Sequence, residues 1–249
     1  MILEIDYGNT RLKWRVLDAK SSVVIAKGSV FDAEQLISHL SHAGYDHFVF
    51  GRMCSVRSSA DNEKIAVLLK SRFGLTVQLA CSQHQLAGVT SAYEDAQRLG
   101  VDRWLAIVAA YAKVQDACVV IDCGTAITVD YLSKEGMHLG GYIAPGLRLL
   151  SGVLKDCSGL SAEKYSTDEI GYELGVNTQG CMNAGIKAMA IGFIKEALTY
   201  GQVKLAYPFT VVCTGGDASL VTAAHENAVM CGDLVFDGLA IACPYNVEK

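Results

Sequence analysis

The chain has 249 residues, of which 51% are hydrophobic and 19% charged, a balance typical of a globular protein and not of a disordered one. Its formal net charge of -5 provides no basic surface, which argues against nucleic acid or an anionic membrane as the main partner and favours a small diffusible ligand. At this length the chain could form one large domain or two modest ones.

The start of the chain and its cysteines indicate an intracellular protein. Glu4 and Asp6 stand where a secretory signal would need basic and then purely apolar residues, and no later segment is long enough to span a membrane. The nine cysteines are odd in number, scattered, and form no C-x-x-C pair. We therefore expect a cytoplasmic protein whose cysteines are mostly buried, reduced thiols.

The first half is predicted to alternate between strands and helices. In chain order we expect strands over 1–6, 11–17 and 21–30, a helix over 32–43, a strand over 47–51, a helix over 59–73 with a Ser cap, and a strand over 75–80. A helix over 102–115 then leads to the second half. This order is typical of an α/β fold.

The second half repeats the plan. In chain order we expect strands over 118–122, 126–133 and 137–146, a helix beginning at about 147, a longer helix over 178–200, a strand over 209–215 and a terminal helix. The chain has only 3 prolines and no Pro/Ser-rich linker. We predict two tightly packed domains, residues 1–115 and 116–249, around a shared cleft.

One short pattern occurs in both halves. A strand ending in Ile-Asp is followed by one residue, a Gly and a hydroxyl or amide side chain, at Asp6-Tyr7-Gly8-Asn9-Thr10 and at Asp122-Cys123-Gly124-Thr125. The apolar phase after the turn differs, since Leu12 aligns with Thr128. Each copy nevertheless begins its own half, which favours duplication over coincidence.

The repeated turn suits a phosphate. A Gly after the strand lets backbone N–H groups approach a ligand with no side chain in the way, and a neighbouring carboxylate suits a cation that accompanies the phosphate. An ordinary turn in which the Asp accepts hydrogen bonds from its own backbone explains either copy alone. The sequence signals neither a P-loop nor a Rossmann glycine motif.

Five motifs together resemble one kinase family. They are DYGNT at 6–10, YEDAQRLGVDRW at 93–104, DCGTAITVD at 122–130, GGYIAPGL at 140–147 and TGGDA at 214–218. The duplicated turns resemble those of the actin, heat-shock ATPase and sugar-kinase superfamily, and the set resembles type III pantothenate kinases. The resemblance implies a duplicated ribonuclease H-like (actin-like ATPase) fold with two α/β halves around a nucleotide cleft.

The same resemblance implies an activity. The enzyme would transfer the γ-phosphoryl group of ATP to the primary hydroxyl of pantothenate, giving 4'-phosphopantothenate in the first step of coenzyme A biosynthesis. Asp102 matches the family's catalytic base, and its neighbour Arg103 can pair with a negative group. From spacing alone, a helix N-terminal cap with a surface Arg is the favoured interpretation of Asp102 and Arg103, and only the family resemblance reverses it.

Further site residues follow from the resemblance. The pantothenate contacts would be Tyr93, Gly100, Val101, Asp102, Arg103 and Thr178, and the ATP contacts Asp6, Tyr7, Gly8, Asn9, Thr10, Arg11, Leu12, Lys13, Thr125, Gly215 and Gly216. Asp6 would lie close to Mg²⁺ through the phosphates, and Asp122 would bind a monovalent cation, K⁺ or NH₄⁺. Thr178 could instead be a helix N-cap, and the Gly215-Gly216 pair a plain strand-to-helix turn.

The resemblance also implies a homodimer that completes the pantothenate pocket.

One departure from the family pattern is Ala96, where a Pro is common, so the local loop could be less rigid. Two alternatives remain open from the residues: a kinase or phosphatase for another small hydroxylated substrate, and a non-catalytic relative that binds nucleotide or a protein.

Overall fold

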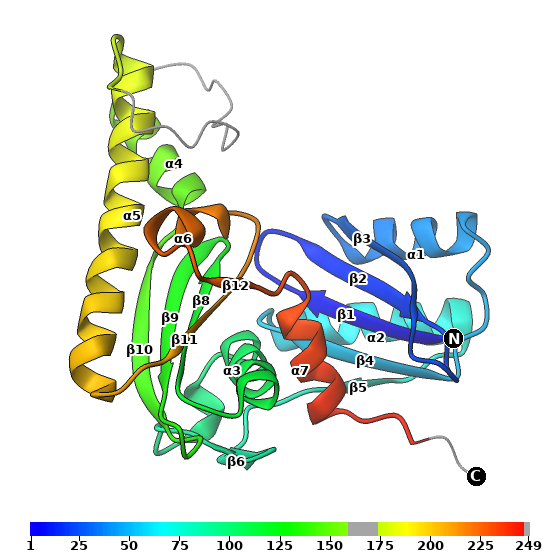
Figure 1. Ribbon diagram of the computed structural model, residues 1–249. Helices are drawn as coiled ribbons and strands as arrows, with labels where there is room; N and C mark the ends of the chain where they lie inside the picture. Colours follow the sequence, from blue (N-terminus) through cyan, green and yellow to red (C-terminus); the bar gives the residue numbers. More distant parts are fainter. Residues whose placement is uncertain (159–173, 247–249) are drawn as a thin grey trace. The chain divides into compact units, whose positions relative to one another are not determined.

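The computed structural model describes residues 1–158 and 174–246 (Figure 1). The described chain forms two compact units, and each unit is built from stretches that are not continuous in the sequence. Unit 1 contains Met1–Ala87, Tyr93–Ala109 and Leu234–Lys249, and unit 2 contains Gly88–Ala92 and Ala110–Asp233. Helix α3 (Val101–Val114) passes from the first unit into the second.

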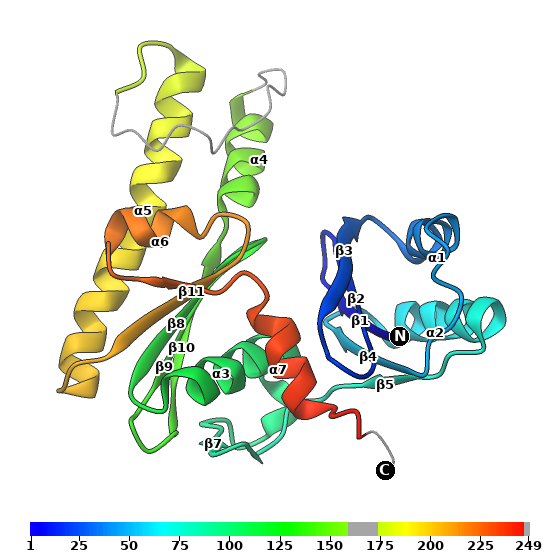
Figure 2. The same cartoon turned by 45° about the vertical axis from the view of Figure 1, so that its right-hand side comes forward.

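Unit 1 is built on a five-stranded sheet with the order β3-β2-β1-β4-β5. Its strands are β1 (Ile2–Tyr7), β2 (Leu12–Leu17), β3 (Val24–Val30), β4 (Phe50–Ser55) and β5 (Val77–Leu79). Helices α1 (Ala33–His42) and α2 (Ser59–Phe73) cover one face, and α7 (Leu234–Ala242) packs on the other face against β1 and β4 (Figure 2). The predicted helix starts are confirmed, because Asp32 and Ser58 accept from the backbone N–H groups of Gln35 and Asp61.

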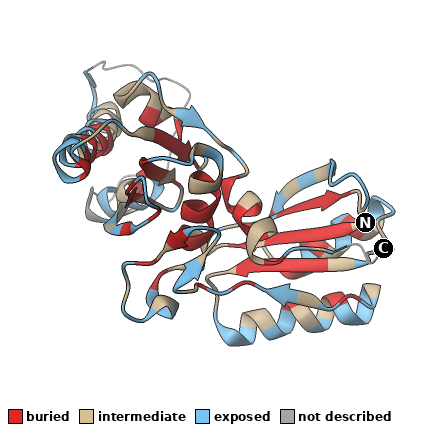
Figure 3. Cartoon of the chain, turned by 60° about the horizontal axis from the view of Figure 1, so that its bottom comes forward, coloured by how far each residue is buried: buried red, intermediate tan, exposed pale blue. Residues whose placement is uncertain are grey.

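Strand alternation divides the residues of unit 1 between these two faces. The apolar side chains of β1 and β2, such as Leu3, Ile5 and Leu12, form a core with α1 and α2. The sheet interior is accordingly buried, while the outer faces of the helices are exposed (Figure 3). The alternate positions, including Glu4 and Asp6, therefore face α7.

Unit 2 repeats this plan with the strand order β10-β9-β8-β11-β12. Its strands are β8 (Cys118–Cys123), β9 (Ala126–Leu132), β10 (His138–Pro145), β11 (Thr210–Thr214) and β12 (Val229–Met230). Helices α4 (Leu147–Ser158), α5 (Thr178–Leu205) and α6 (Ser219–Ala224) supply residues to a core with β8, β9 and β11. In both sheets the three hairpin strands are antiparallel and the last two are parallel.

The matching topology confirms the duplicated fold and explains the phase difference between the turns. Tyr7 pairs with Leu12 across the first turn, while Cys123 pairs with Ile127 across the second, so the second turn is one residue shorter. Lys13 therefore corresponds in space to Thr128. A shift of one residue reverses which side chains face the core.

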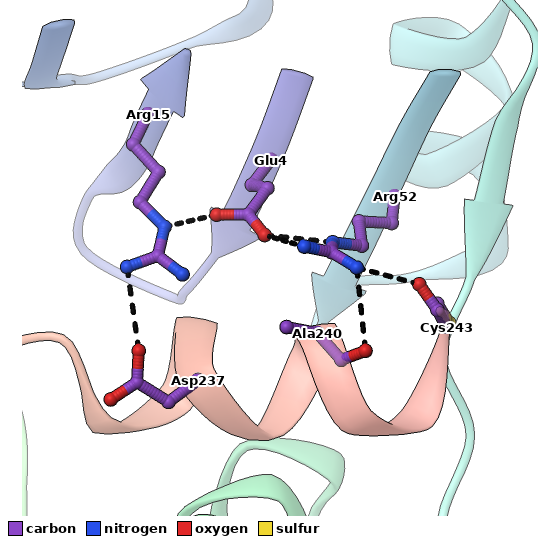
Figure 4. Close-up of polar contacts among 6 residues, drawn as sticks. All are labelled: Glu4, Arg15, Arg52, Asp237, Ala240 and Cys243. Carbon is purple, nitrogen blue, oxygen red and sulfur yellow. Dashed lines mark hydrogen bonds and ion pairs between the residues drawn. The ribbon is translucent and has the colours of Figure 1, made fainter. Parts of the chain in front are cut away.

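A buried ion network holds α7 on the sheet of unit 1 (Figure 4). Glu4 is fully buried and pairs with both Arg15 and Arg52, and Arg15 Nη1 lies 3.5 Å from Asp237 on α7. Arg52 Nη1 also donates to the carbonyl of Cys243 at 2.8 Å. The network gives the only fully buried carboxylate of β1 two cationic partners, as a buried charge requires.

Several element boundaries differ from the sequence predictions. The strand expected at 47–51 is β4 and begins at Phe50, and α5 extends beyond 200 to Leu205. Short elements that the sequence did not signal are β6 (Gln85–Leu86), β7 (Val89–Thr90), the 3₁₀ helix η1 (Ala96–Arg98) and β12.

Most of the cysteine side chains that the structure describes are buried, as expected. All eight described thiols are free, and five of them are buried: Cys54, Cys118, Cys123, Cys213 and Cys243. The ninth, Cys157, has its side chain outside the described residues. Within the described ranges, no helix combines the length and apolarity that a membrane span needs.

Candidate active site

The first repeated turn joins β1 to β2. The Gly8 N–H donates to the Arg11 carbonyl at 3.0 Å, and a Cβ on Gly8 would lie 3.2 Å from the same oxygen. Asp6 is half-buried, and the exposed Lys13 places its Nζ 4.0 Å from Asp6 Oδ2. A carboxylate and an ammonium therefore stand at the base of a turn whose tip, Asn9 and Thr10, is exposed.

The structure limits what three of the predicted ATP contacts could contribute. The side chains of Tyr7 and Leu12 are buried in the core with α1 and α2, so only their backbone could reach a ligand. The guanidinium of Arg11 lies 3.8 Å above the ring of Phe31, so one face of it is already occupied by a cation–π contact.

The start of α3 brings together the predicted substrate residues. Asp102 lies in its first turn, and its Oδ1 accepts from the Arg103 N–H at 2.8 Å. Arg103 is buried and its Nη1 donates to the Tyr93 hydroxyl at 3.4 Å. The alternative of a surface Arg is therefore wrong. The Ser82 hydroxyl donates to the Leu99 carbonyl at 2.7 Å and fixes the chain just before Gly100.

Asp6 and Asp102 both lie near the thiol of Cys54. Cys54 is opposite Asp6 in the parallel pairing of β1 and β4. Burial raises the pKa of Cys54 well above its usual value, and the negative charges of Asp6 and Asp102 raise it further. The carboxylate of the phosphate-type turn and the predicted base thus occupy the same region of unit 1.

A pocket of about 450 Å³ opens beside this region. It is lined by the chain after β4, the chain after β5 and the approach to α3; the lining includes Arg57, Cys81, Ser82, Arg98, Gly100 and Val101. Two residues of the predicted substrate run therefore face a cavity of the size that small ligands occupy.

The second turn, in unit 2, is surrounded by close glycine contacts. The Gly124 N–H donates to the Ala126 carbonyl at 3.0 Å. Gly215 has a φ of 95°, and a Cβ there would lie 2.5 Å from Asp122 Oδ1. Gly146 is equally close to the Thr125 carbonyl, at 2.5 Å from a Cβ. The motifs at 122–125, 146 and 215 therefore meet around one carboxylate.

The carboxylate chemistry of both turns suits cations held jointly with a ligand. In the described part of the chain, no three His, Cys, Asp or Glu residues form a group that could hold a metal by themselves. Mg²⁺ is commonly bound by one or two carboxylates together with substrate phosphates, so the single Asp of the first turn fits this cation. Near Asp122, burial raises the pKa of Asp217, and the charge of Arg148 partly offsets this.

Thr178 is the first residue of α5 and is exposed. The N-cap of α5 is Asn177, whose side chain accepts from the Gly180 N–H at 2.8 Å, so the alternative of Thr178 as the cap is wrong. Thr178 belongs to unit 2, whereas Tyr93, Gly100 and Asp102 belong to unit 1.

Sequence reasoning missed Arg57 and its neighbours in the pocket. With the fourth strand predicted to end at 51, residues 52–58 had no structural context. In the structure β4 runs to Ser55 beside β1, so Arg57 follows the same sheet edge as the first turn. A charged residue directly after a strand parallel to β1 is the signal that a correct boundary would have provided.

Known proteins provide an independent comparison with this site. Residues 2–199 match the family described as type III pantothenate kinase. The chain belongs to this family.

Curated relatives agree with the assignment. Type III pantothenate kinases from Pseudomonas fluorescens (strain Pf0-1) and Ectopseudomonas mendocina (strain ymp) are 38% and 40% identical, each over 98% of this chain and 99% of the relative. The family resemblance inferred from the motifs is therefore confirmed.

Solved structures share the fold at low sequence identity. A protein from Sinorhizobium meliloti, provisionally named a 2-dehydro-3-deoxygalactonokinase, is 14% identical to this chain with a TM-score of 0.60. The match covers 98% of this chain and 100% of that chain. An activator of the 2-hydroxyisocaproyl-CoA dehydratase from Clostridium difficile, with bound ADPNP, is 12% identical with a TM-score of 0.51, covering 97% and 92%. These likenesses confirm the actin-like ATPase fold.

Proposed function

We propose that this chain phosphorylates the primary hydroxyl of pantothenate with ATP, giving 4'-phosphopantothenate in the first step of coenzyme A biosynthesis. Membership of the type III pantothenate kinase family supports the proposal. The observation that carries it is that β4 ends beside the phosphate-type turn, with Ser55 opposite Tyr7, and that Ser55 lines one pocket with Val101, the residue before Asp102.

In the proposed reaction, Asp102 accepts the proton of the pantothenate hydroxyl while that oxygen attacks the γ-phosphorus. The bond from this phosphorus to the bridging oxygen breaks, and ADP leaves. Arg103, oriented by the Tyr93 hydroxyl, pairs with a negative group of the substrate. Gly100 and Val101 line the pocket that receives the acceptor.

The turn from Asp6 to Lys13 would hold the phosphates of ATP. Backbone N–H groups of Asn9 and Thr10 would bind phosphate oxygens, Gly8 would leave room for their close approach, and Lys13 would neutralise developing charge. Asp6 would hold Mg²⁺ together with those oxygens; a bound Mg²⁺ supplies Lewis-acid stabilisation of the phosphates.

The proposal gives unit 2 the other nucleotide and cation contacts. Thr125 would contact ATP, and Gly215 and Gly216 would allow adenosine to approach the backbone closely. Asp122 would bind K⁺ or NH₄⁺ beside the second turn. The predicted domain division, 1–115 and 116–249, and a cytoplasmic location also belong to the proposal.

A homodimer that completes the pantothenate pocket through Thr178 is part of the same proposal. Unit 2 exposes large apolar side chains on neighbouring elements, namely Ile143 on β10, Val153 on α4 and Met189 on α5. Such residues are unfavourable in water and suit a protein interface. Sedimentation equilibrium should give a dimer, and a fully active monomer would contradict this part of the proposal.

The test of the function is direct. The purified protein is incubated with ATP, MgCl₂, KCl and pantothenate, and the product is identified by mass spectrometry. Formation of 4'-phosphopantothenate with matching ADP release supports the proposal. ATP consumption only with other hydroxylated acceptors would indicate a different substrate, and no consumption with any acceptor a non-catalytic role.

A further inference from the structure

Arg57 lies between the phosphate-type turn and the pocket of unit 1. Beyond β4, the backbone continues beside β1, since the Val56 N–H donates to the Tyr7 carbonyl at 3.2 Å. The Arg57 side chain turns back over this edge: Nη1 donates to the Asn9 carbonyl at 3.4 Å, and the guanidinium carbon lies 5.5 Å from the centre of the Tyr7 ring. Arg57 also lines the pocket that contains Gly100 and Val101.

The contacts of Arg57 with the described residues orient its guanidinium but engage only two of its three nitrogens. Asp61, in the first turn of α2, places Oδ2 at 3.2 Å from Nε. Hydrogen bonds from Ser58, followed by the charge of Arg57, lower the pKa of Asp61, so this partner stays ionised. The contacts reach Nε and Nη1, while about a third of the side chain remains exposed.

Negative charge would exceed positive charge at this site once a polyphosphate is bound, so an additional cation would be stabilising. Two carboxylates, Asp6 and Asp102, lie near Cys54, and a polyphosphate brings several more negative charges. Lys13 already forms an ion pair with Asp6, and Arg103 already donates a hydrogen bond to the Tyr93 hydroxyl. A guanidinium presents several donors in a planar fork that matches phosphate oxygens.

We propose that Arg57 contacts the phosphoryl group during its transfer and stabilises the charge on its equatorial oxygens. The inference rests on the proposed kinase function and adds a residue to it. The bonds that form and break are those of the ATP reaction, with the proton accepted by Asp102. The role of Arg57 is electrostatic and involves no proton transfer.

The test uses Arg57→Gln, Arg57→Lys and a matched control, Arg72→Gln. Arg72 makes the same kinds of contact, an ion pair with Asp46 at 3.2 Å and a position 5.3 Å from the Phe73 ring, but lies on the far end of α2. Arg57→Gln should lower kcat by about 10²–10³, the usual cost of losing one transition-state donor. The KM for ATP should stay within about threefold, Arg57→Lys should recover part of the rate, and Arg72→Gln should match the parent.

A binding measurement separates this inference from the identity of the acceptor. ADP is titrated with MgCl₂, with and without aluminium fluoride, which forms a mimic of the transferring phosphoryl group. The parent and Arg72→Gln proteins should bind ADP more tightly with the fluoride, and Arg57→Gln should lose that gain while keeping its affinity for ADP alone. Loss of pantothenate phosphorylation in the parent with this pattern intact would overturn only the proposed substrate.

Two results would overturn the inference. One is a kcat for Arg57→Gln within threefold of the parent. The other is an equal loss of affinity for ADP with and without fluoride, which would assign Arg57 a purely structural role at the turn. Thermal unfolding of each variant shows whether it is folded, and Arg57→Lys provides the comparison if Arg57→Gln is not.

Discussion

Helix α7 approaches α3 so closely that a single methyl group should disturb the proposed base. A Cβ on Gly238 would lie 2.0 Å from the Leu105 carbonyl oxygen, whereas ordinary contacts begin at 3.4 Å. Gly238→Ala therefore requires the two backbones to separate by about 1.4 Å. The network of Glu4, Arg15 and Arg52 fixes α7 on the sheet, so α3 should move instead.

The consequence should appear in both stability and catalysis. Overpacking of this kind costs about 1–3 kcal/mol, and each kcal/mol lowers Tm by about 2–4 °C in a protein of this size. Leu105 is one turn from Asp102, and a displacement of about 1 Å can lower a rate by 10²-fold. We expect Gly238→Ala to lower kcat by about 10–100-fold in the pantothenate assay.

The control is the same substitution where space is free. Gly192 lies on α5 with nothing within 4 Å of its added Cβ. Gly192→Ala should stabilise the helix by about 0.5–1 kcal/mol and leave kcat unchanged. A Gly238→Ala protein with the parent's Tm and kcat would refute the reasoning.

Three further predictions follow from charges and close contacts. Glu4→Gln should lower the unfolding free energy by about 3–5 kcal/mol in urea titrations because it removes the buried carboxylate that Arg15 and Arg52 share, while Glu34→Gln, at an exposed pair with Lys64, should change it little. Burial raises the pKa of Cys54, so the thiol ionises first in the unfolded chain; stability is complete below the usual thiol pKa and is lost as the pH rises above it. Urea midpoints should therefore fall between pH 8 and 10, and fall less in Cys54→Ala; equal falls would contradict the assignment. Asp122→Asn should abolish a rate advantage of K⁺ or NH₄⁺ over Na⁺, and equal parent rates in the three salts would remove the cation role.

Much of the fold was predictable because the apolar period changes sharply along the chain. Alternation in β1 and β2 and helical spacing in α1 follow directly from which side chains face the core. The duplication was predictable from the two turns, but the alignment of the strands that follow them was not. The second turn is shorter by one residue, and the sequence shows this only as a changed apolar phase after the turn. Short elements such as β6 and β12 have too few residues for a period to show.

The site was predictable where local motifs determine it and unpredictable where tertiary pairing does. Asp102 lies in a helical first turn beside Arg103, as the motif indicates. The burial of Arg103 against Tyr93 depends on residues ten positions apart that meet only in the folded chain. The position of Arg57 beside the first turn depends on where β4 ends and on its pairing with β1. That pairing joins residues far apart in the sequence, so no local pattern predicts it.

The central claim is that Asp102 is the base of an ATP-dependent pantothenate kinase. The most direct measurement compares kcat for 4'-phosphopantothenate formation in the parent and in Asp102→Asn, with ADP affinity and Tm measured on the same samples. We expect kcat to fall by about 10²–10⁴-fold with ADP affinity and Tm retained, because an amide cannot accept the hydroxyl proton. A kcat within a few-fold of the parent would contradict the account.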